Sequence, residues 1–167
     1  MTNVRIDQVV PSFSIGDAIG NDALALREIL RRRGVVSEIF VRRAHADLER
    51  ESRPWTEYAS VDTPGNACLF HFSIGTPIAE DFPRLRARRV LVYHNITPPE
   101  YAHGVNPVME HECRLGREQL RRLAASAELG IADSEFNRRE LEVAGCVQTA
   151  VIPIIVDFAD HDRQEAA

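Results

Sequence analysis

Residues 4–41 read VRIDQVVPSFSIGDAIGNDALALREILRRRGVVSEIFV, and this stretch decides the fold. The apolar run from Val4 to Val10 predicts a buried strand, and the run from Val35 to Val41 predicts another. A loop with two glycines and a helix that stops at Gly34 separate them. The apolar positions at helical spacing are Ile19, Ala23, Leu26 and Leu30. Strand, loop, helix and strand in this order form a βαβ unit with parallel strands.

The same alternation continues along the chain. Further strands are expected at residues 67–72, 90–93, 130–132 and 149–155. One helix begins at Asn106-Pro107, and another begins at Ser134 and ends at Gly145. The first of these helices has a predicted core face of Met109, Cys113, Gly116, Leu120, Leu123 and Ala127. Residues 44–65 predict a short helix and a long loop. The expected fold class is α/β, a Rossmann-like open and mostly parallel sheet with helices on both faces.

Length and composition fit one globular domain. The chain has 167 residues and a formal net charge of −5, which leaves no basic footprint for nucleic acid. All 20 basic residues are arginine. Without a lysine, none of these residues can form a Schiff base, anchor pyridoxal phosphate or serve as a phosphate-loop lysine.

The cysteines and the hydropathy pattern indicate a cytoplasmic protein. Cys68, Cys113 and Cys146 are odd in number and widely spaced, so they suggest neither a disulfide framework nor a zinc ribbon. No apolar run approaches the roughly 20 residues that span a bilayer, and no secretory leader is evident. Peripheral attachment to the inner membrane face remains compatible with this expectation.

The loops after the strands hold the candidate binding residues, because ligands of open parallel sheets bind beyond the carboxyl ends of the strands. In the first loop, Gly16 and Gly20 let a backbone approach a ligand, beside Asp17 and Asn21. The pattern is G-x-x-x-G rather than the dinucleotide fingerprint G-x-G-x-x-G. An NADP oxidoreductase, with Arg42-Arg43 on the cofactor phosphate, is therefore a minor alternative.

His94 follows the strand at 90–93 and has Asn95 beside it. A histidine at this place can bind a sugar hydroxyl or exchange a proton, or it can be a strand-end side chain satisfied by backbone. His71 and Ser73 lack the G-x-S-x-G elbow of a nucleophilic serine, and His71 is expected to be packed.

No metal site is expected from the sequence. In Glu110-His111-Glu112 the side chains do not share a helix face, and no H-E-x-x-H occurs. Asp160-His161-Asp162 matches a D-x-D metal motif, but it lies in a polar terminal stretch and is not counted as a metal site.

Four stretches in their order resemble the N-terminal domain of group-1 (family 4) retaining glycosyltransferases of the GT-B fold. They are QVVPSFSIGDAIGND at 8–22, FHFSIG at 70–75, YHNITPPEY at 93–101 and ADSEFNRREL at 132–141. The resemblance implies that Gly16, Gly20 and their neighbours Asp17 and Asn21 face the donor diphosphate and the acceptor. It implies that His94 touches the transferred sugar and acts as the catalytic residue.

The resemblance further implies a metal-independent enzyme that uses a nucleotide-sugar as co-substrate and no cofactor. The remaining residues implied to line the site are Ser73, Asn95, Ser134, Asn137 and Arg138. The expected domain is 1–158, and 159–167 is read as a polar tail where an interdomain linker begins.

The family's second domain, with its paired glutamates and most donor contacts, has no counterpart in these 167 residues. We therefore expect an acceptor-side domain with little or no transferase activity alone, whose partners are a sugar or glycan acceptor and a donor-binding domain in cis or in trans. A homodimer is compatible with this. The alternative is a non-catalytic α/β module that binds a ligand or has a regulatory role.

Overall fold

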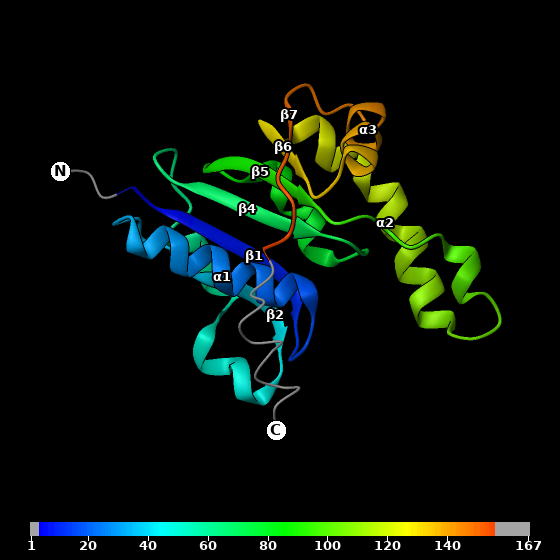
Figure 1. Ribbon diagram of the computed structural model, residues 1–167, viewed down its shortest axis with the longest axis horizontal. Helices are drawn as coiled ribbons and strands as arrows, with labels where there is room; N and C mark the ends of the chain where they lie inside the picture. Colours follow the sequence, from blue (N-terminus) through cyan, green and yellow to red (C-terminus); the bar gives the residue numbers. More distant parts are fainter. Residues whose placement is uncertain (1–3, 156–167) are drawn as a thin grey trace.

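The computed structural model describes residues 4–155, and within them the chain forms one seven-stranded parallel sheet. The strand order is β3-β2-β1-β4-β5-β6-β7, with every described pair parallel. This confirms the predicted α/β class (Figure 1). The strands are β1 (Ile6–Phe13), β2 (Ile39–Ala44), β3 (Arg53–Pro54), β4 (Ala67–Phe72), β5 (Arg88–Tyr93), β6 (Leu129–Ala132) and β7 (Thr149–Val151).

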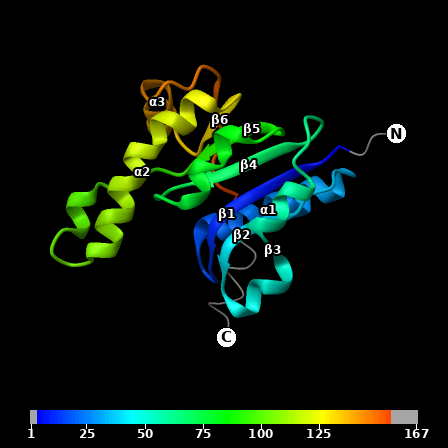
Figure 2. The same cartoon turned by 180° about the vertical axis from the view of Figure 1, so that it is seen from behind.

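Helices cover both faces of the sheet, because alternate residues of the central strands face opposite cores. In β1, Val9 belongs to the larger core and Val10 to the smaller one. The smaller core lies under α1 (Ala18–Arg32), and α2 (Pro107–Ser126) and α3 (Glu135–Val143) pack over the larger (Figures 1 and 2). Five 3₁₀ helices connect the remaining elements: η1 (Ala46–Glu51), η2 (Trp55–Ser60), η3 (Pro77–Glu80), η4 (Phe82–Arg84) and η5 (Pro99–Ala102).

Helix starts and stops follow the predicted capping residues. The side chains of Asn106 and Ser134 accept hydrogen bonds from the backbone N–H groups of Met109 and Asn137, respectively. Gly145 has the positive φ, 106°, that its place after α3 requires. The capping residues of α2 and α3 therefore lie where the sequence predicts them.

The prediction that Met109 packs in the core was wrong. The side of α2 that contacts the sheet begins at Cys113, whereas Met109 is 37% exposed. Figure 1 shows the amino-terminal half of α2 extending beyond the sheet together with η5. The apolar face that the sequence pattern predicts for α2 is therefore longer than the part of the sheet against which α2 packs.

Strand limits also differ from the predictions. The stretch 44–65 contains β3, a two-residue edge strand that pairs with β2 and includes Pro54. Proline is tolerated there because an edge strand needs no donor on its outer side. The seventh strand ends at Val151 rather than at residue 155, and Pro153 follows shortly after.

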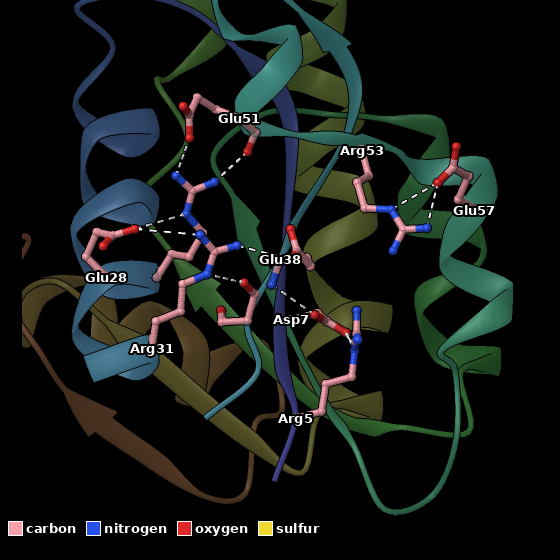
Figure 3. A network of polar contacts seen from close by, with 10 residues as sticks. Arg5, Asp7, Glu28, Arg31, Glu38, Glu51, Arg53 and Glu57 are labelled. Atoms are coloured by element: carbon pink, nitrogen blue, oxygen red, sulfur yellow. Dashed lines mark hydrogen bonds and ion pairs between the residues drawn. The ribbon is translucent and has the colours of Figure 1, made fainter. Parts of the chain in front are cut away.

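Charged contacts gather around Asp7 and Glu38, near the amino ends of β1 and β2, with Arg31 of α1 among them (Figure 3). The buried Asp7 carboxylate accepts from Arg5 Nε at 2.6 Å and from the Glu38 backbone N–H at 3.1 Å. Arg31 pairs with Glu38 at 3.1 Å. Burial raises the pKa of Asp7, although Arg5 opposes the change. These contacts have a structural role, since each charge is paired: Asp7 with Arg5, and Arg31 of α1 with Glu38 before β2.

Candidate functional site

The candidate residues gather at one edge of the sheet. The loop before α1 follows β1, Ser73 follows β4, His94 follows β5 and Ser134 follows β6. These four strands are consecutive in the sheet, and parallel strands end at the same edge. Gly16, His94 and Ser134 therefore lie along a single rim, as predicted.

A chain of hydrogen bonds joins His94 to the interior of the sheet. His94 Nε2 lies 2.9 Å from His71 Nδ1, and His71 Nε2 lies 3.0 Å from Gln8 Oε1. Gln8 Nε2 donates to the Ala23 carbonyl at 2.9 Å. The two imidazole rings are inclined by only 6°, with centroids 5.1 Å apart, which suits an in-plane N–H···N bond. His71 is buried as predicted, but it is packed within a polar chain.

Carboxylates surround the other side of His94. Asp133 Oδ2 lies 3.7 Å from His94 Nδ1, and the His94 side chain is 3% exposed. Asn137 Nδ2 donates to Asp133 Oδ1, and Ser134 Oγ accepts from Asn137 N at 3.2 Å. The N-terminus of α3 therefore holds Asp133 in place.

Burial favours the neutral form of both histidines. Burial and the neighbouring His94 together lower the pKa of His71 to about 3. Burial also lowers the pKa of His94, and the charges of Asp22, Asp133 and Asp17 oppose this. A proton on His94 would thus be placed among three carboxylates.

A pocket of about 280 Å³ opens beside His71, between the β1–α1 loop and the end of β4. His71, Asp17 and three serines supply its polar wall, and aliphatic side chains supply the rest. The full lining is Val10, Pro11, Ser12, Ser14, Asp17, Ile19, His71, Ser73 and Ile74. The mixture suits a small ligand with hydroxyl groups and an apolar face.

The first loop places its predicted residues in different roles. Gly16 is exposed and has φ +74°, the left-handed conformation that glycine adopts most easily. Asp17 caps α1 and accepts from Gly20 N at 3.1 Å. Gly20 is buried against the ring of Phe13, and Asn21 is exposed on α1. The carboxylate of Asp17 occupies the N-terminus of α1. This helix end is therefore less suited to binding an anion.

The later loops separate their predicted residues. Asn95 has φ +71°, and its Oδ1 accepts from Ile96 N at 2.7 Å. Arg138 is held on the surface of α3 by Glu135 and Glu142, which raises the pKa of Arg138. The structure does not bring Arg138 to the His94 cluster. Its role in binding stays a prediction.

Three residues of the cluster, Gln8, Asp22 and Asp133, were not singled out as site residues, although Asp22 and Asp133 lie within the segments after the strands, 11–22 and 133–138, where binding residues are expected. Asp133 directly follows β6 and precedes the cap Ser134, so its position after a strand was a usable signal. Gln8 gave no such signal, because it lies inside β1, and Asp22 lies in the second turn of α1. The pairing of β1 with β4 brings Gln8 to His71, and the packing of α1 on the sheet brings Asp22 to the histidines.

Asp22, His71 and His94 form the one set of ligand atoms within 4.8 Å of one another that could hold a metal ion among residues 4–155. Its geometry favours hydrogen bonding. The two ring nitrogens that face each other form a hydrogen bond at 2.9 Å, and Asp22 Oδ1 accepts from Ile155 N at 2.8 Å. A bound ion would have to displace these bonds.

Two larger hollows lie along α2, away from this cluster. One, of about 430 Å³, lies between α2 and α3 beside Arg117 and Phe136, and the other, of about 710 Å³, lies between η5 and α2. Arg117 is paired there with Glu140 at 2.7 Å. By volume alone, the hollows along α2 would be the preferred site. The buried titratable groups, however, gather at the carboxyl edge of the sheet, and such groups indicate a functional site better than volume does.

A scan of the chain against models of protein families finds no match, and a search of the curated proteins finds none either. Within residues 4–155, no helix is both long and apolar enough to cross a bilayer. The function is therefore inferred from the geometry of the site and from the sequence motifs.

Proposed function

We propose that this chain is the acceptor side of a retaining, nucleotide-sugar-dependent glycosyltransferase. The observation that carries the proposal is the gathering of hydrogen-bond acceptors at the carboxyl edge of a Rossmann-like sheet. The Asp17 and Asp133 carboxylates and neutral His94 belong to loops of that one rim. Sugar hydroxyls are donors, and acceptors of this kind orient them.

The acceptor would enter the 280 Å³ pocket beside Asp17 and Ser73. Its reacting hydroxyl would point along the rim toward His94, and the sugar would pass from the departing nucleoside diphosphate to this hydroxyl. Around His94 the described charged neighbours are acidic. The negative diphosphate is therefore better held by a second, donor-binding domain, and reaction requires both surfaces together.

Ligand-observed NMR tests the acceptor role. A panel of neutral mono- and disaccharides is mixed with the full chain, and saturation transfer identifies those that bind. Asp17→Asn should weaken their binding at least several-fold, because a charged acceptor is replaced by a neutral one. Asp47→Asn on exposed η1 is the matched control and should leave binding unchanged. Absence of binding by every sugar, or equal binding by both variants, contradicts the proposal.

A non-catalytic α/β ligand-binding module is the second candidate, and the burial of His94 favours it. A side chain that is 3% exposed touches a ligand only if part of the rim moves. A transfer assay distinguishes the two candidates. A donor-binding domain and a radiolabelled nucleotide-sugar are supplied together with an acceptor sugar that binds the chain. Transfer of the radiolabelled sugar supports the enzyme, and binding without transfer supports the module.

A further inference from the structure

The hydrogen-bond chain fixes the protons of both histidines. A backbone carbonyl only accepts, so the contact with the Ala23 carbonyl identifies Nε2 of Gln8 as the donor and leaves Oε1 facing His71. His71 must then donate from Nε2. Since neutral imidazole carries one N–H, His71 Nδ1 is an acceptor, and His94 must donate to it from Nε2.

The assignment leaves His94 Nδ1 without a proton. Among residues 4–155, no group forms a hydrogen bond with this atom, although it is fully buried. The closest acidic atom is Asp133 Oδ2 at 3.7 Å, which is also an acceptor. Two hydrogen-bond acceptors, His94 Nδ1 and Asp133 Oδ2, therefore face each other. They are satisfied only when another group donates a hydrogen between them.

We propose that Nδ1, and not Nε2, is the functional nitrogen of His94, and that His71 is the positioning residue that keeps it unprotonated. The inference extends the proposed function, in which His94 is the residue that meets the substrate, but it concerns the free protein and requires no sugar. A hydroxyl hydrogen or a proton is received at Nδ1, on the side of Asp133. Nε2 is committed to His71 throughout.

The groups facing His94 come from three elements. Asp17 and Asp22 belong to the start of α1, Asp133 follows β6, and His71 belongs to β4. Without His71, the Nε2–H of His94 would lose its acceptor at 2.9 Å, and the nearest carboxylate is then Asp133, 3.7 Å from Nδ1. His94 would then carry its hydrogen on Nδ1 and donate to Asp133. His71 thus decides between two tautomers.

Nitrogen-15 NMR of the histidine rings reads the tautomer directly. In the full chain at pH 7.5, both His71 and His94 should show Nε2 as the protonated nitrogen and Nδ1 as the bare one. As the pH is lowered, the His94 Nδ1 resonance should move to the protonated position while Nε2 remains protonated. A hydrogen on His94 Nδ1 at pH 7.5 overturns the proposal.

Two variants of similar size separate positioning from packing. In His71→Asn the side-chain oxygen can accept from His94 Nε2, so the wild-type tautomer should persist. In His71→Leu the acceptor at 2.9 Å is removed, and the His94 hydrogen should move to Nδ1. Identical His94 spectra in the two variants contradict a positioning role.

Gln8→Met tests the same chain from its other end and remains informative if His71→Leu does not fold. It removes the acceptor for His71 Nε2–H, so both histidines should change tautomer together. Retention of both wild-type tautomers overturns the proposal. If sugars fail to bind while the tautomers are as stated, the acceptor role is lost and the His71 assignment stands.

Discussion

Gly116 lies so close to Gly75 that a Cβ atom at Gly116 would be 2.8 Å from the Gly75 backbone nitrogen. The Gly75 N–H donates to the Glu112 carbonyl of α2 at 2.9 Å. This contact of two glycine backbones seats α2 on the loop after β4, next to Ser73. The position of the candidate rim thus depends on the absence of two side chains.

Gly116→Ala should therefore destabilise the protein although alanine favours helices. The added methyl group meets backbone that cannot rotate away, and overpacking of this kind costs about 1–3 kcal/mol. Urea unfolding measures the change in the free energy of unfolding. Gly65→Ala is the control, since a Cβ at Gly65 meets no atom within 4 Å, and it should change stability by less than about 0.5 kcal/mol. Equal stability of both variants would show that α2 is seated differently.

Asn95 adopts a conformation that few side chains tolerate, with φ +71°. Asn95→Val should lose about 1–2 kcal/mol of stability, because a β-branched residue is strained in the left-handed region. Asn95→Gly removes the strain together with the side chain and should fold at least nearly as well. The sugar affinity of Asn95→Gly then decides the role of the side chain. Affinity equal to wild type means that Asn95 serves the turn alone.

Much of the fold follows from local patterns in this sequence. The strand at Ala67–Phe72 and the caps Asn106 and Ser134 were predicted at the observed positions, because apolar runs and capping chemistry act within a few residues. Residues 53–54 were missed since a two-residue edge strand has no periodicity. Met109 was assigned to the core because the pattern cannot show how far the sheet extends under α2.

The candidate site was predictable only in part. The strand-end rule located His94, Gly16 and Ser134 on one rim, since it follows from the topology of parallel strands. It could not single out Gln8 or Asp22, because the pairing of β1 with β4 and the packing of α1 bring these two side chains to the histidines. It also could not show that His94 is nearly buried.

His94→Ala should therefore affect folding more than a surface position would, because it leaves His71 Nδ1 without a donor.

Gly16→Val tests the conformation of the first loop. At φ +74° the valine side chain is strained even though the surrounding space is open, and a cost of about 1–2 kcal/mol is expected. Gly16→Asn is the control, because asparagine enters the left-handed region more easily, and it should lose less than valine. Thermal unfolding compares the two variants. Equal melting temperatures for valine, asparagine and wild type would mean that the loop adopts ordinary negative φ in solution.

The buried His71 should make stability depend on pH. Its pKa is lowered to about 3 from the ordinary 6.5, so the unfolded chain binds more protons than the folded one between these values. The stabilising effect is complete above pH 6.5 and is lost progressively as the pH falls below it. Between pH 6 and 5, the free energy of unfolding should fall by about 1 kcal/mol through this residue.

His71→Asn removes the titrating ring, so its free energy of unfolding should decline less steeply over pH 6 to 5 than that of wild type, by about 1 kcal/mol per pH unit. His111→Asn provides the control, because His111 is exposed on α2, outside the hydrogen-bond chain of His71. Its pH dependence should match that of wild type. The comparison cancels the carboxylates common to all three proteins. If the free energy of unfolding of His71→Asn depends on pH as that of wild type does, His71 takes up its proton in the folded protein. A neutral His71 then cannot be what determines the tautomer of His94.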